Sequence, residues 1–196
     1  MMNHFSSLAI AGVISLSLLG CSQNELGSTT QNISTKTTNT RAKEPSPKYN
    51  EGITLVAGDF ETYKQTLKKH EGKIVLVDFW ASWCPPCMAA FPHTVKFHGK
   101  YGEDQFTAIS VSVDSEEDHE QALRFLQKQN ADFDNLRMTY DIGESFRLLE
   151  IPGAVPCIKI YDRSGAVAKV FSGKELADPH AEKNIELEIR KLLDTK

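Results

Sequence analysis

The sequence predicts an α/β fold in which helices cover a mixed β-sheet that is parallel in its centre. From residue 51 onward, apolar segments typical of buried strands alternate with segments of helical periodicity. The segment 73–80 is rich in β-branched and aromatic residues, which is typical of a central strand covered on both faces. Two later strands flank the turn sequence Asp162-Arg163-Ser164-Gly165, which predicts a closing antiparallel hairpin.

Each element follows from a local pattern. Asp59 is suited to cap a helix that runs to about His70, and Gly72 separates this helix from the strand at 73–80. A second helix starts at Pro85, where proline is tolerated in the first turn, and Pro92 is expected to kink it. The remaining elements are strands over 106–113, 136–139, 157–161 and 166–171, and helices over 116–129, 143–149 and 179–193.

The composition is that of one globular domain. The 196 residues are 40% hydrophobic, with 26 acidic and 22 basic side chains and a net charge of −4. A chain of this charge has no general positive field for a phosphate backbone, so nucleic acid is excluded as an expected partner. Four cysteines are too few for a small fold held together by disulfides, so each cysteine is considered by itself.

The N-terminal region is predicted to contain a targeting signal followed by a flexible tether. Phe5 to Leu19 is uncharged and apolar but shorter than the roughly 20 residues that span a bilayer, as in a signal peptide. It leads into Leu18-Leu19-Gly20-Cys21, which resembles the lipobox of bacterial lipoproteins and implies lipid attachment at Cys21. The segment MMNHF departs from this pattern in having no Lys or Arg. We therefore expect a signal peptide over 1–20, a lipidated flexible tether over 21–50 and a folded domain over 51–196.

The chemistry of the domain is expected at Cys84-Pro85-Pro86-Cys87. Two cysteines at this spacing can close a small disulfide, and the N-terminus of a helix favours a thiolate at the first of them. Cys84 is thus the expected attacking thiolate, and Cys87 the thiol that resolves a mixed disulfide. Half a zinc site is the alternative, but a second pair of ligands is not evident, so no metal is expected.

The segment from Val77 to Cys87, VDFWASWCPPC, resembles the active-site segment of the thioredoxin superfamily. The resemblance extends to Pro92 and to Val155-Pro156, which aligns with the cis-proline loop of that superfamily. About 42 residues separate Val113 from Pro156, which leaves room for an extra helix and strand before this loop. Together with the lipobox, this insert makes the chain resemble membrane-anchored thiol:disulfide oxidoreductases of the TlpA and ResA type.

The resemblance assigns expected roles to further residues. It implies that Trp83 and Val155 border the substrate groove, that Pro156 is cis, and that Asp78 accepts the proton of Cys87. Independently, a carboxyl group within a buried strand should have a raised pKa, which suits it to proton transfer. Thioredoxins usually place a Lys near this Asp, and the aligned position here is Ser110.

Two further features concern the thiols. Pro85 and Pro86 remove two amide donors near the sulfur of Cys84, so we expect a moderately depressed Cys84 pKa and a reducing couple. Cys157 directly follows Pro156 and is expected in the same neighbourhood as the CxxC pair. It is interpreted either as a small buried apolar residue or as a third redox thiol.

These observations favour a reductase of extracytoplasmic protein disulfides, held on the periplasmic side of the cell envelope by its lipid. Such an enzyme needs a membrane electron donor, uses only its own disulfide as redox group, and is expected to be a monomer. The alternatives are an oxidase or isomerase of DsbA or DsbC type, and a copper-binding module of the same fold. A peroxidase is disfavoured because Val77 and Ala81 occupy positions where peroxiredoxins have Pro and Thr or Ser.

Overall fold

The computed structural model describes residues 49–102 and 104–195, so the predicted signal peptide, Cys21 and nearly all of the tether lie outside the described residues. Within the described ranges, no helix combines the length and the apolar character needed to cross a membrane.

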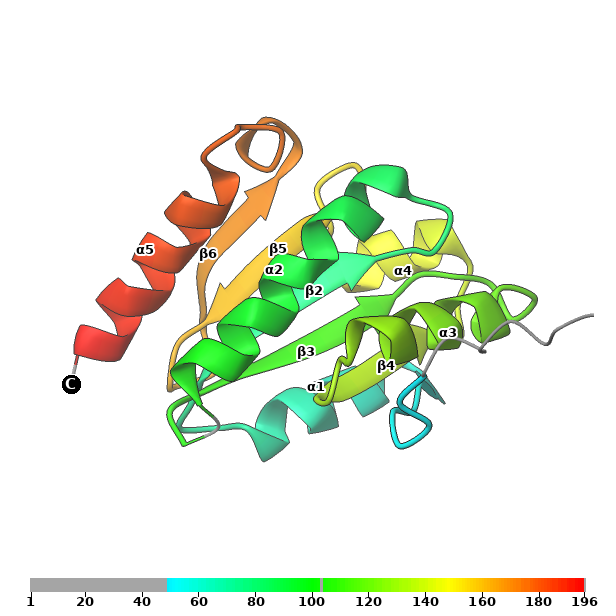
Figure 1. Ribbon diagram of the computed structural model, residues 1–196, viewed down its shortest axis with the longest axis horizontal. Coiled ribbons are helices and arrows are strands. Elements are labelled where there is room, and N and C mark those ends of the chain that lie inside the picture. The colour runs from blue at the N-terminus through cyan, green and yellow to red at the C-terminus, as the bar shows by residue number, and fades with distance from the viewer. Residues whose placement is uncertain (1–48, 103, 196) are drawn as a thin grey trace, which may run out of the picture. The chain divides into compact units, whose positions relative to one another are not determined.

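Six strands form one mixed sheet in the order β1-β4-β3-β2-β5-β6 (Figure 1). Strands β1 to β4 run parallel to one another, whereas β5 is antiparallel to both β2 and β6. The elements are β1 Val56–Gly58, α1 Phe60–Lys69, β2 Ile74–Trp80, α2 Pro85–Tyr101, β3 Phe106–Ser112, α3 His119–Gln129, β4 Asp134–Met138, α4 Ile142–Leu148, β5 Cys157–Tyr161, β6 Val167–Ser172, a 3-10 turn Gly173–Glu175 and α5 Ala181–Asp194. The predicted mixed sheet, its closing hairpin and the insert before residue 156 are confirmed.

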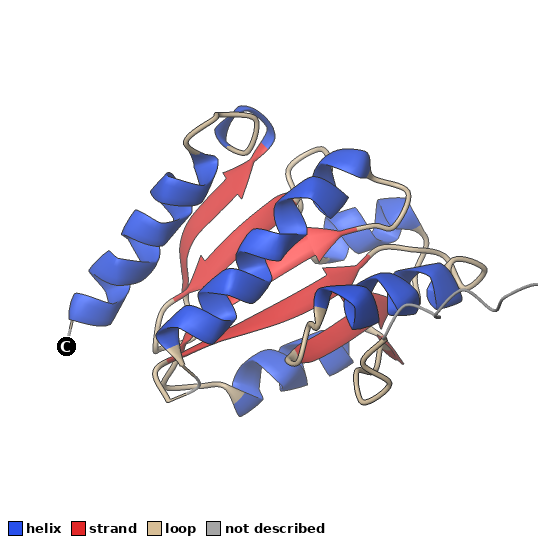
Figure 2. Cartoon of the chain, viewed as in Figure 1, coloured by secondary structure: helices blue, strands red, loops and turns tan. Residues whose placement is uncertain are grey.

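Helices cover both faces of the sheet, as Figures 1 and 2 show. Helices α2, α3 and α5 lie on one face: Trp80 of β2 packs 5.1 Å, between ring centroids, from Phe91 of α2 and from Phe125 of α3. Helices α1 and α4 lie on the other face, where Tyr63 of α1 packs 6.1 Å from Phe79 of β2. Strand β2 is therefore buried over its whole length, as its apolar sequence predicts.

Local side-chain bonds explain where two helices begin. The Asp59 carboxylate accepts the Thr62 amide proton at 2.8 Å and caps α1 as expected. Helix α3 starts at His119 and not at 116, which corrects the prediction. The Ser115 hydroxyl donates to the Asp118 carboxylate at 3.0 Å, and such short-range bonds hold the chain in a turn in place of a first helical turn.

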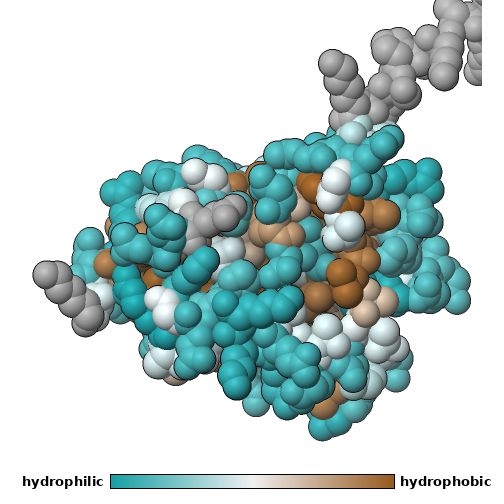
Figure 3. Space-filling model, turned by 90° about the horizontal axis from the view of Figure 1, so that it is seen from below, coloured by the Kyte–Doolittle hydropathy of each residue, from teal (hydrophilic) through white to brown (hydrophobic). Residues whose placement is uncertain are grey.

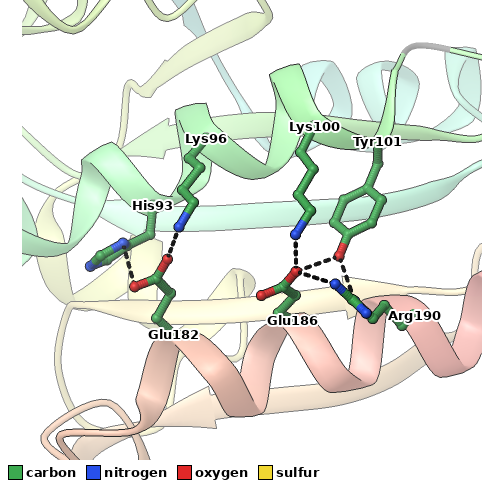
Figure 4. A network of polar contacts seen from close by, with 7 residues as sticks. All are labelled: His93, Lys96, Lys100, Tyr101, Glu182, Glu186 and Arg190. Carbon is green, nitrogen blue, oxygen red and sulfur yellow. Dashed lines mark hydrogen bonds and ion pairs between the residues drawn. The ribbon is translucent and has the colours of Figure 1, made fainter.

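Helix α5 runs beside α2 and is joined to it by polar contacts (Figure 4). Lys96 donates to Glu182 at 2.6 Å, and Tyr101 donates to Glu186 at 2.9 Å. Lys100 and Arg190 also pair with Glu186. The lysine and arginine side chains of these pairs are exposed and the two glutamates partly so, which limits the contribution of the pairs to stability.

The surface is mainly hydrophilic, with apolar side chains gathered in one region of the face that Figure 3 shows. The large apolar side chains that stay exposed in the described ranges are Tyr49, Val56, Trp83, Tyr140, Ile142, Val167 and Leu187. Three of them, Trp83, Tyr140 and Ile142, lie just beyond the carboxyl ends of parallel strands, where ligand sites of α/β proteins usually lie.

Candidate active site

Cys84 and Cys87 form a disulfide at the N-terminus of α2, with an S–S distance of 2.05 Å. Cys84 is the N-cap residue, and its Sγ accepts the amide proton of Cys87 at 3.3 Å. Pro85 and Pro86 occupy the first two helical positions and have no amide proton to offer. The helix therefore presents few donors to the Cys84 sulfur, in agreement with the expectation from sequence.

The loop before β5 brings a second segment to this sulfur. The Val155–Pro156 peptide bond is cis, as the resemblance to the thioredoxin superfamily implies, and the carbonyl oxygen of Val155 lies 3.7 Å from Cys84 Sγ. A groove of about 370 Å³ runs between this loop, Pro86 of α2 and Leu176 after β6. Its walls are mostly apolar, so the groove can accommodate an extended peptide beside the disulfide.

The two cysteines differ little in burial, but their surroundings differ in access. Cys84 is 6% exposed and Cys87 2% exposed, whereas the neighbouring Trp83 is 48% exposed. The exposed indole thus marks the entrance to the disulfide, and Cys84 is the sulfur that lies beside both Trp83 and the cis-proline loop.

Asp78 lies within β2, 3% exposed, on the face of the sheet that α2 covers. Burial raises the pKa of this carboxyl to about 6, although a hydrogen bond from the Thr94 hydroxyl acts in the opposite direction. That bond measures 2.7 Å. Ser110 is the register partner of Asp78 in β3, and its hydroxyl donates to Asn135 at 2.7 Å. The position that holds Lys in thioredoxins thus supplies no cation to Asp78.

Thr94 is a site residue that the sequence reasoning missed. Cys87, Phe91 and Thr94 follow one another at four- and three-residue spacing, so they share one buried stripe of α2. Asp78 faces this stripe from the sheet. The helical spacing from Cys87 was the available signal, but the partner of Thr94 emerges only from the packing.

Asp114 is a second residue that was missed. Its carboxylate accepts the amide proton of Ser82 at 2.9 Å and the Ser82 hydroxyl at 2.8 Å, and it is 1% exposed. Ser112 also donates to it at 2.6 Å. Asp114 therefore fixes the loop that leads to Cys84 against the end of β3. An acidic residue directly after a buried strand was the signal in the sequence.

Cys157 is free and fully buried at the start of β5. It pairs with Phe79 in β2, and since paired residues share a face, its side chain lies on the side of α1 and not of α2. Burial raises the pKa of this thiol to about 11. The ranges 49–102 and 104–195 contain no cluster of three or more His, Cys, Asp or Glu side chains able to hold a metal ion.

Comparison with known proteins identifies the family of this chain. The model of the AhpC/TSA family matches residues 50–170. The chain belongs to the AhpC/TSA family. Within it, the thiol-disulfide oxidoreductase ResA of Halalkalibacterium halodurans is 27% identical over 125 residues, covering 63% of this chain and 67% of that protein. ResA of Bacillus thuringiensis subsp. konkukian is 26% identical over 127 residues, covering 64% and 69%.

A solved structure agrees with this assignment. A Chlorobium tepidum protein described as thiol:disulfide interchange protein DsbE superimposes with a TM-score of 0.55 at 30% identity, covering 65% of this chain and 84% of that one. This AhpC/TSA domain thus has a thioredoxin-like fold, and it is a thiol-disulfide oxidoreductase of the ResA/DsbE type with the pair Cys84 and Cys87.

Proposed function

We propose that the protein reduces disulfides of extracytoplasmic proteins. The observation that carries this proposal is the Cys84–Cys87 disulfide at the start of α2, with the Cys84 sulfur against the cis-proline loop. The dithiol form of Cys84 and Cys87, produced by reduction of this disulfide, is the form that reacts with the substrate. The reaction needs no other redox group, because two thiols supply the two electrons that convert a substrate disulfide into two thiols.

In the first step, the Cys84 thiolate attacks one sulfur of the substrate disulfide. A bond forms between Cys84 and that sulfur, the substrate S–S bond breaks, and the second substrate sulfur leaves as a thiolate that takes up a proton. Trp83, Val155 and Pro156 bind the substrate chain beside Cys84. The backbone of Val155, whose carbonyl lies next to the sulfur, is suited to pair with an extended peptide.

In the second step, Cys87 resolves the mixed disulfide. Its thiol gives up a proton and attacks the Cys84 sulfur, so the Cys84–Cys87 bond forms and the first substrate sulfur leaves reduced. Asp78 accepts the Cys87 proton in this proposal. A pKa of about 6 leaves most Asp78 side chains ionised at neutral pH, and the carboxyl faces the α2 stripe that begins with Cys87.

The small number of amide donors at the Cys84 sulfur supports the proposed direction of electron flow. Oxidants of this fold owe their strength to a strongly stabilised thiolate in the reduced form. Here Pro85 and Pro86 remove two donors and leave the Cys87 amide. This scarcity of donors favours a reductant over an oxidase or isomerase.

The N-terminal sequence supports a place on the periplasmic side of the cell envelope. Cleavage after Gly20 and lipidation of Cys21 would leave a tether that ends near residue 50, and two acyl chains hold a protein firmly at a membrane. We propose that the protein acts there as a monomer and receives electrons from a membrane donor. Replacing Cys21 by Ser is expected to move the protein from the membrane fraction to the soluble fraction.

Measurement of the reduction potential tests the proposed direction. We expect a Cys84/Cys87 couple at or below about −250 mV, and a value near −120 mV would contradict a reductase. In an insulin reduction assay, Cys84→Ser should abolish turnover, and Cys87→Ser should accumulate a mixed disulfide with the substrate. The matched control is Cys157→Ser, which should retain turnover because that thiol is buried on the other face of the sheet.

A further inference from the structure

A second groove, separate from the one at the cis-proline loop, is bordered by Trp83. It has a volume of about 470 Å³ and is formed by the loop after β3 and the connection from β4 to α4. Both segments follow parallel strands, so the groove sits at the carboxyl end of the sheet, where α/β proteins usually bind ligands. The insert supplies nearly all of its lining, and Trp83 connects it to Cys84.

Exposed aromatic and aliphatic side chains form the apolar part of this groove. Trp83 is 48% exposed, Tyr140 36% and Ile142 44%, although large apolar side chains are usually buried in a domain of this size. The faces of Trp and Tyr rings attract cationic side chains such as those of Arg and Lys. The apolar wall can therefore hold both the aliphatic stem and the charged end of a basic residue.

The charged groups of the groove are predominantly acidic. Its lining includes the carboxylates of Glu116, Asp118 and Asp141, with Arg137 as the basic residue. The guanidinium of Arg137 is 3% exposed and already satisfied within the protein, because it donates to Glu116 and to the Met138 carbonyl. It is thus unavailable to an incoming anion.

The other two carboxylates are those of Asp118, which is partly exposed, and Asp141, which is exposed. Asp118 accepts a hydrogen bond from the Ser115 hydroxyl, and Asp141 accepts one from the Glu144 amide. Both partners are neutral groups, and neither aspartate forms an ion pair with another residue of ranges 49–102 and 104–195. Two acidic side chains beside an aromatic wall complement a cation and not an anion.

We propose that this groove docks a lysine- or arginine-bearing segment of the partner protein, close in sequence to the cysteine that Cys84 attacks. The proposal rests on the proposed function and adds a substrate preference to it. Because Trp83 borders the groove and immediately precedes Cys84, the basic residue would lie within a few positions of the reacting sulfur. The cis-proline groove would hold another part of the same chain.

Peptide disulfides that differ only in the residues flanking the cysteine test this preference. Second-order rate constants are measured for the reduced full chain with peptides carrying flanking lysine, serine or glutamate. Each is divided by the rate constant of the same peptide with dithiothreitol, which removes the effect of charge on the disulfide itself. We expect the normalised value to be about tenfold higher for lysine than for glutamate, and to converge at high salt.

Paired charge variants locate the preference. Asp118→Asn with Asp141→Asn should lower the lysine-to-glutamate ratio by about three- to tenfold, and asparagine still caps α4. The control is Glu71→Gln with Asp132→Asn, which removes the same net charge from exposed positions outside this groove. It should leave the ratio unchanged.

The possible outcomes distinguish a failure of the docking-site proposal from a failure of the proposed reductase function. Equal normalised rates for the lysine and glutamate peptides, or an equal loss in the control pair, would overturn the docking site while the reductase assignment stands. Failure of the wild-type protein to reduce any of the three peptides would overturn the proposed function, and the docking site with it.

Discussion

Replacing Asp78 by Asn should make the protein more stable at alkaline pH and a poorer catalyst. Burial raises the pKa of the Asp78 carboxyl from 3.8 to about 6, so the folded protein holds this proton more tightly than the unfolded chain does. Stability is therefore greatest below the unfolded value and falls as the pH rises through the window between about 4 and about 6. Each pH unit of separation corresponds to about 1.4 kcal/mol, so ionised Asp78 costs about 2 to 3 kcal/mol at pH 8.

Urea unfolding of the oxidised protein at pH 4 and pH 8 measures this cost. The free energy of unfolding of Asp78→Asn minus that of wild type should rise by about 2 to 3 kcal/mol between the two pH values, because asparagine does not ionise. The Thr94 hydroxyl can donate to an amide oxygen as it does to the carboxylate. If the stability difference between Asp78→Asn and wild type changes by less than about 0.5 kcal/mol between pH 4 and pH 8, Asp78 is not a carboxyl group that burial destabilises when ionised.

Substitutions at Thr94 and Asp114 and a labelling experiment on the cysteines test three further predictions. Thr94→Val removes the hydrogen bond that lowers the pKa of Asp78, so the pH at half-maximal turnover should rise. Thr94→Ser keeps the hydroxyl and should leave that pH unchanged. Identical pH profiles for Thr94→Val and wild type would exclude this positioning role for Thr94. Asp114→Ala leaves the buried Ser82 donors without their acceptor and should lower the free energy of unfolding by about 2 to 3 kcal/mol in urea titrations, and a loss below about 0.5 kcal/mol would count against the anchor. Iodoacetamide at pH 8 should label Cys84 of the reduced protein but leave Cys157 unmodified, because burial raises the pKa of the Cys157 thiol to about 11. A Cys157 disulfide in mass maps after mild oxidation would instead support a third redox thiol.

The features that were predictable from sequence are those with a local cause. The apolar run of β2, the N-cap Asp59 and the proline positions of α2 each depend on residues within a turn or two, so their outlines match the structure. The insert was predictable from the spacing between Val113 and Pro156, once the family resemblance had located the cis-proline loop. Helix α3 shows the limit: a hydrogen bond between Ser115 and Asp118 delays its start, and periodicity does not reveal such a bond.

The site was less predictable where it depends on packing between elements. The position of Cys157 next to Pro156 suggested the surroundings of the CxxC pair, but pairing with Phe79 turns its side chain to the other face of the sheet. A one-residue change in register would reverse that outcome, and the sequence does not specify the register of β5 against β2. Thr94 and Asp114 are similar cases, because each meets its partner only after a helix or loop packs on the sheet.

Two features of this site, the prolines after Cys84 and the serine beside Asp78, act on different steps of the proposed disulfide exchange. The prolines at 85 and 86 offer no amide protons to the Cys84 sulfur, and the proposed electron donation to substrate depends on this scarcity of donors. Serine at position 110 withholds a cation from Asp78, so burial dominates and its pKa rises to about 6. A base of this strength is ionised near neutral pH yet basic enough to take up a proton, which suits the resolving step of Cys87. Adding a donor at Cys84 should therefore change the potential, whereas changing Asp78 should change the rate of resolution and leave the potential nearly unaltered.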